Sequence, residues 1–195
     1  MVLCIGMAVI HADEVPKSFA WDPPKVRKSM FSENLGMLDS ERDDYATNLA
    51  IHAVKHLVAG KESAASLTDA RHMIALALQL SPRNKRAVVV NFQLAKGILP
   101  DVPESSYNAP AFARLILTRG QLLEKQGGDE NKLLARLFFD LAATLDPKNE
   151  DAVYASEMHR LDAGPVDWSS VTDAKPAPTP KSVPETKAAS GHHGL

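Results

Sequence analysis

Apolar residues recur at helical spacing from residue 40 to residue 163. The first such stretch begins at Ser40, where a Ser-Glu-Arg-Asp capping box precedes it, and carries Tyr45, Leu49, Val54, Leu57 and Val58 as far as Gly60. Five further stretches follow: 66–80, 84–97, 109–126, 129–146 and 149–163, separated by proline, glycine and asparagine. The pattern predicts an all-α domain of about six antiparallel helices over residues 40–164.

The segments on either side of this domain have no such period. Residues 13–39 contain three prolines and predict an irregular lead-in, and residues 165–195 are rich in Pro, Ala and Lys, which predicts a disordered tail. Residues 1–12 are apolar with Ala12 at a small-residue cleavage position, so we interpret them as a signal peptide. The basic start of a typical signal is missing, so either the true start lies upstream or the signal is a poor one. The alternative to a signal is a buried amino-terminal strand or a frayed end.

Export is the localisation that this interpretation predicts. The protein would then be periplasmic or envelope-associated, and it would be cytoplasmic if the signal is not real. The single cysteine, Cys4, lies inside the predicted signal, so the mature chain would contain no disulfide and no thiolate metal ligand. We expect no membrane span in the mature chain.

The chain contains an internal repeat. The stretch ALQLSPRNKRAV, 77–88, and the stretch AATLDPKNEDAV, 142–153, are 65 residues apart and share six of twelve residues. Before each proline, a large residue stands between two small ones, which lets two helices approach closely while the large side chain fills the gap. The residues that we expect to pack the repeats in this way are Ala70, Ile74, Ala77 and Pro82 in the first copy and Gly120, Ala135, Phe139, Ala142 and Pro147 in the second.

This pattern of small, large, small and then Leu-x-Pro-x-Asn resembles a degenerate tetratricopeptide repeat. Gly120 and Gly127, seven residues apart, match the first helix and turn of that family. The resemblance implies helix hairpins stacked as a short superhelix whose concave face binds peptides or partner proteins. A generic helical bundle is the alternative. A short array also makes self-association possible, since stacked repeats stabilise one another.

Composition and motifs exclude several other functions. The net charge of −2 is spread along the chain without a basic block, so we expect no nucleic-acid partner. The sequence has no phosphate loop, nucleophile elbow, HExxH motif or calcium loop. We therefore expect neither catalysis nor a cofactor. The alternative is a metal site at His52 and His56, four residues apart, but a site needs a third ligand that this helix does not offer.

The expected function is a non-enzymatic interaction scaffold or adaptor. The alternative is an accessory subunit that positions a catalytic partner in an envelope or secretion assembly. Helical phase places the candidate partner-binding residues on solvent-facing sides of the first helix of each hairpin: Asn48, His52, His56, Arg114 and Gln121. The two repeat turns differ in charge, with Arg83, Lys85 and Arg86 in one and Lys148, Glu150 and Asp151 in the other, which predicts asymmetric docking.

Overall fold

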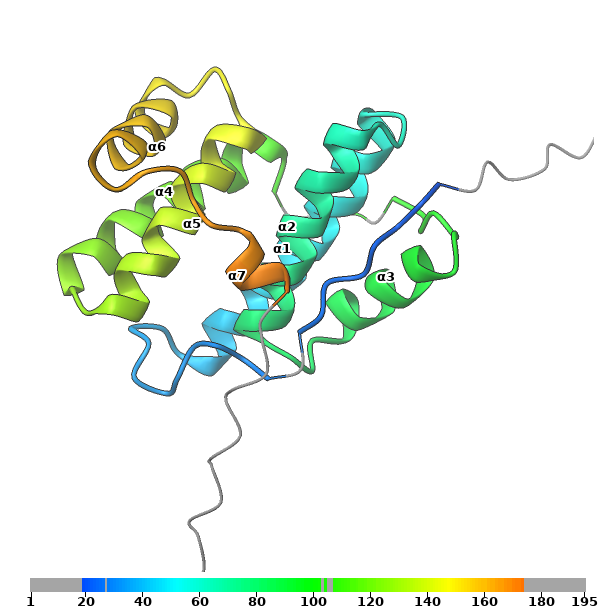
Figure 1. Cartoon of the computed structure of the whole chain (residues 1–195), viewed down its shortest axis with the longest axis horizontal. Coiled ribbons are helices and arrows are strands. Elements are labelled where there is room, and N and C mark those ends of the chain that lie inside the picture. Colours follow the sequence, from blue (N-terminus) through cyan, green and yellow to red (C-terminus); the bar gives the residue numbers. More distant parts are fainter. Residues whose placement is uncertain (1–18, 27, 103, 105–106, 174–195) are drawn as a thin grey trace, which may run out of the picture.

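The computed structural model confirms the all-α prediction. It describes residues 19–26, 28–102, 104 and 107–173, and this part of the chain contains seven helices and no strand (Figure 1). The helices are α1 (Asp39–Ala59), α2 (Ala64–Leu80), α3 (Lys85–Ala95), α4 (Ala109–Gln126), α5 (Asp129–Leu145), α6 (Glu150–Ala163) and α7 (Ser169–Thr172). None of the described helices is long and apolar enough to cross a membrane.

The 65-residue offset of the sequence repeat also relates the helices. Shifting α2 (64–80) by 65 residues gives the bounds of α5 (129–145), and α3 and α6 start at equivalent positions. Each copy is a three-helix unit: α1 packs against α2 and α3, and α5 packs against α4 and α6. The two units lie side by side, with α7 between them (Figure 1).

Asparagine caps and prolines define several of the helix ends. The side chains of Asn84, Asn108 and Asn149 each accept a hydrogen bond from the backbone N–H three residues later. Pro82 and Pro147 lie exposed in the turns that follow α2 and α5.

Three predictions about the first two helices are wrong. Ser40 does not cap α1, which already begins at Asp39 after Leu38 and has no side-chain cap. Ser63 caps α2, three residues before the predicted start at 66, because its Oγ accepts from the N–H of Ser66. Val58 does not lie on the buried side of α1 but is exposed.

The small and large residues of the repeat are buried, whereas its two prolines, Pro82 and Pro147, are exposed. Ala70, Ile74, Ala77, Ala135, Phe139 and Ala142 are all at most 1% exposed. Gly120 is buried on α4 against Phe139 of α5, and a Cβ atom at this glycine would lie 2.6 Å from the Phe139 ring. The glycine therefore sets how closely α4 and α5 approach.

Aromatic stacking joins the two units. Tyr45 of α1 stacks on Phe138 of α5, with ring centroids 5.4 Å apart, and lies 6.4 Å from the ring of Phe112. His52 lies two helical turns further along α1, and its ring stacks on Phe112 with the ring centroids 4.8 Å apart. An ion pair of 2.8 Å between Arg119 of α4 and Glu41 of α1 adds a polar link.

The segment 165–173 packs on the body, so the predicted tail boundary at 165 is wrong. It contains α7, whose Val171 and Thr172 are buried. Gln79 Nε2 of α2 donates to the Val171 carbonyl at 3.0 Å, and Arg71 Nη2 pairs with Asp173 at 2.9 Å. Long-range contacts hold this segment, and no local pattern signals them.

The lead-in is irregular, as predicted, but it also packs on the body. Phe31, Leu35 and Met37 are buried in the core. The predicted signal at 1–12 and the tail at 174–195 lie outside the described residues, so both stay predictions.

Replacing Gly120 by alanine should lower the free energy of unfolding by about 1 kcal/mol or more, because the rigid Phe139 ring cannot yield. Helix propensity alone would change stability by about 1 kcal/mol in the opposite direction, so the sign reports the contact. Chemical denaturation measures it, and adding Phe139→Leu should restore part of the loss. Unchanged or raised stability in Gly120→Ala would contradict the packing.

A chain that ends after Asp173 should unfold at the same temperature as the full chain. A chain that ends after Gly164 should lose at least about 2 kcal/mol, because it lacks the buried Val171 and the Trp168 contacts. Paired thermal and urea melts of the two truncated chains check this. Equal stability of both would show that α7 contributes nothing to the body.

Candidate functional site

Two adjoining hollows form a groove between α1 and α4, the first helices of the two units. One hollow is lined by Glu41, Asp44, Tyr45, Asn48, Tyr107, Phe112 and Leu115, and the other by Tyr45, Leu115, Thr118, Arg119, Gln121, Leu122 and Lys125. Each has a volume of about 330 Å³. Because Tyr45 and Leu115 line both, the two hollows make one continuous surface, which we call the α1–α4 groove.

The groove combines an apolar wall with acids in one hollow and cations in the other. Leu115 and Leu122 are seven residues apart on α4, so they share a helix face, and both are exposed. Glu41 and Asp44 are in one hollow and Arg119 and Lys125 in the other. Arg119 is engaged by Glu41 and also donates to the Gly36 carbonyl. Lys125 and Asp44 form no ion pair with any of the residues that the structure describes.

Tyr45 forms the floor of the groove. Burial, together with the nearby Glu41 carboxylate, raises the pKa of Tyr45 to about 12. The phenol therefore stays neutral at physiological pH, and its ring is fixed by Phe138 and Phe112. The floor is rigid and uncharged.

His52 lies beneath the groove and not on its surface, which corrects the prediction that it faces solvent. It is 1% exposed, stacked on Phe112, and its Nε2 atom has no hydrogen-bond partner. Burial, and to a lesser degree the charge of Lys55, lowers the pKa of His52 from 6.5 to about 4. The imidazole is therefore neutral at pH 7 and acts as a flat apolar ring.

His56 is also not part of a solvated histidine stripe. Its Nε2 atom lies 2.9 Å from Asp69 Oδ2 on α2, so it links the two helices of the first hairpin. His52 thus contacts α4 and His56 contacts α2, so each imidazole is engaged by a different neighbouring helix. Within the described residues, no group of three or more His, Cys, Asp or Glu could hold a metal ion.

The other predicted residues are divided between groove and open surface. Asn48 and Gln121 line the groove as expected for a partner-binding surface, whereas Arg114 is exposed on α4 outside the lining. Sequence reasoning missed Tyr45, Leu115 and Leu122, the apolar part of the surface. The signal for the two leucines was their seven-residue spacing, which adds a second apolar face to α4.

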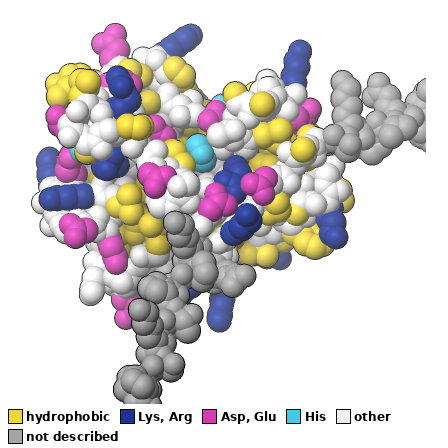
Figure 2. All heavy atoms as spheres, in the orientation of Figure 1, with side chains coloured by type: hydrophobic (Ala, Val, Ile, Leu, Met, Phe, Trp, Pro, Cys, Tyr) yellow, Lys and Arg dark blue, Asp and Glu magenta, His cyan; other side chains and the backbone are white. Residues whose placement is uncertain are grey.

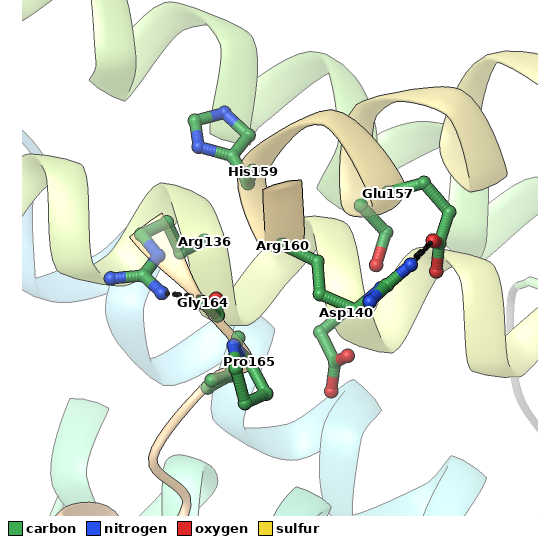
Figure 3. A pocket seen from close by; sticks show the side chains of 9 residues that line it. Arg136, Asp140, Glu157, His159, Arg160, Gly164 and Pro165 are labelled. Carbon is green, nitrogen blue, oxygen red and sulfur yellow. Dashed lines mark hydrogen bonds and ion pairs between the residues drawn. The ribbon is translucent and has the colours of Figure 1, made fainter. Parts of the chain in front are cut away.

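A smaller hollow of about 140 Å³ lies between α5, α6 and residues 164–166 (Figure 3). Arg136 Nη2 donates to the Gly164 carbonyl at 3.0 Å, Arg160 is paired with Glu157, and His159 Nε2 lies 2.9 Å from Glu124. The Arg136 contact ties the turn after α6 to α5, the His159 contact ties α6 to α4, and the Arg160 pair lies within α6. We therefore regard this hollow as structural and the α1–α4 groove as the candidate site.

Comparison with family models, curated proteins and solved structures finds no match for this chain. The assignment to a tetratricopeptide-like class therefore remains a prediction from the sequence.

Stability should fall as the pH drops from 6.5 toward 4, by up to about 3 kcal/mol from His52 alone. The sign follows because the folded state has the lower pKa, so the unfolded chain binds the proton first. The His52→Phe variant keeps a flat ring on Phe112 and should show a weaker pH dependence in urea titrations. Parallel profiles for the two proteins, or an NMR titration of His52 near its ordinary pKa, would contradict the burial.

Proposed function

We propose that this protein is a non-enzymatic interaction scaffold that binds a short segment of a partner protein in the α1–α4 groove. The observation that carries the proposal is the continuity of the two hollows through Tyr45 and Leu115. A concave surface with apolar walls and a few polar groups is the form that a peptide-binding site takes. The resemblance to tetratricopeptide repeats supports the same surface, because that family binds partners along its first helices.

The lining determines which kind of segment fits. Leu115 and Leu122 offer apolar contacts to one or two apolar side chains of the partner. Lys125 lies in the hollow with Leu122 and favours an acidic neighbour, while Asp44 in the other hollow favours a basic one. The preferred partner is therefore a short segment that combines apolar side chains with one acidic and one basic residue. Asn48 and Gln121 supply amide groups for its backbone.

Export enters the proposal only because residues 1–12 are interpreted as a signal peptide. If those residues are a signal, the partner is a protein of the envelope. The binding chemistry of the groove is the same in either compartment.

Panning a displayed peptide library on the full chain should enrich peptides with this charge pattern. The Leu115→Glu, Leu122→Glu double variant should bind an enriched peptide at least about tenfold more weakly, because it loses apolar contacts and adds charge. Fluorescence anisotropy with a labelled synthetic peptide measures the affinity.

The control is Val58→Glu, which places one glutamate on an exposed apolar position of α1 outside the groove lining. It should bind the peptide as the unaltered protein does. Equal binding by the groove variant and the control would overturn the proposal, and so would the absence of any enriched peptide.

A further inference from the structure

Apolar side chains lie exposed on the third helix of each three-helix unit. On α3 these are Val88, Val89 and Phe92, and on α6 they are Tyr154, Met158 and Leu161. Phe92 is 62% exposed, Tyr154 68% and Leu161 69%. Figure 2 shows hydrophobic side chains gathered over α6 at the upper left and over α3 at the right. Neighbouring exposed apolar residues of this size indicate an interaction surface.

The positions on each helix form one face. Five residues with helical spacing form what we call the α3 face: Lys85, Val88, Val89 and Phe92 of α3, and Lys96, which directly follows the helix. Its opposite side is buried against α1 through Ala87, Val90 and Leu94. Glu150, Tyr154, Met158, Leu161 and Asp162 make the equivalent α6 face. Ala152 is the one buried residue of α6, and one side of the helix packs on α5, where His159 stacks on Phe139, while the α6 face points away from this contact.

The two faces carry opposite charge. From residue 83 to 96 the chain has four cations, Arg83, Lys85, Arg86 and Lys96, and no acid. From residue 148 to 163 the chain has four acids, Glu150, Asp151, Glu157 and Asp162, and two cations, Lys148 and Arg160, and Arg160 is held by Glu157 at 2.8 Å. In helical projection Arg160 points away from the α6 face, so that face is acidic at both ends.

We propose that copies of this protein associate head to tail, with the α3 face of one copy against the α6 face of the next. The apolar centres supply burial, and the charged ends supply orientation and selectivity against α3–α3 and α6–α6 pairs. The two faces lie on opposite sides of the body, so one copy cannot pair its own faces (Figure 1). Such an interface joins different surfaces of identical chains and can continue from copy to copy.

A second copy fits these faces better than an unrelated protein does. The two faces lie on equivalent helices of the two repeat units and have similar length. They are opposite in charge, and each has an apolar centre. One helix face on each side makes a small interface, below the size of standard stable complexes, so the association is weak and reversible. It is independent of the α1–α4 groove, which lies on other helices.

Sedimentation velocity of the full chain, from low to high micromolar concentration, tests the proposal. We expect a mass that rises with concentration and falls with added salt, because the charged ends are exposed. A protein that stays monomeric throughout overturns the proposal and leaves the two faces to another partner.

Charge exchange gives the decisive comparison. Two triple variants should each self-associate at least about tenfold more weakly than the unaltered protein. The α3 variant carries Lys85→Glu, Arg86→Glu and Lys96→Glu, and the α6 variant carries Glu150→Lys, Asp151→Lys and Asp162→Lys. An equimolar mixture should assemble again, since each copy then meets a face of opposite charge. Restored assembly also shows that neither variant is misfolded.

A matched control reverses three exposed lysines outside both faces: Lys28→Glu, Lys61→Glu and Lys132→Glu. It should associate as the unaltered protein does. Loss of association in this control, or a mixture of the two face variants that stays monomeric while circular dichroism shows both folded, overturns the proposal.

Discussion

The contact between the two three-helix units rests on a small group of stacked rings, and the groove depends on it. Tyr45 and His52 of α1 meet Phe112 and Phe138 of the second unit, so α1 and α4 are held at a fixed separation. The ion pair between Arg119 and Glu41 adds a polar contact between the same two helices. Both rings on α1 are neutral near pH 7 because burial opposes their charged forms. A charge at either ring would disfavour the stack and, with it, the hollow above.

Local signals made the helices of this protein predictable. Asparagine side chains cap α3, α4 and α6, and prolines follow α2 and α5, so each end is determined within a few residues of sequence. The Ser40 capping box failed because the same residue types also occur inside a first turn, where acids suit the helix dipole. The small and large residues of the repeat were predictable because their packing partner lies on the adjacent helix.

The site was less predictable, because it depends on contacts between distant segments. Helical phase alone placed His52 in solvent, yet α1 packs against α2 and α3 and also meets the second unit, so its residues are buried on several sides. Leu115 and Leu122 were ordinary apolar positions until the arrangement of α4 left them at a groove. Segment 165–173 has a composition typical of a linker, and only its contacts with Gln79 and Arg71 show that it belongs to the body.

The first and last described segments of the chain are bonded to each other. The N–H of Lys25 donates to the Thr172 carbonyl at 2.7 Å, and Arg71 contacts both Asp22 and Asp173. Arg71 of α2 therefore holds both segments, and the two ends of the described body lie close together. A circularly permuted chain, joined near these residues and opened at the turn of Gly127 and Gly128 between α4 and α5, would retain nearly all of the packing described above. Groups fused to the two ends of the body would also be neighbours in space.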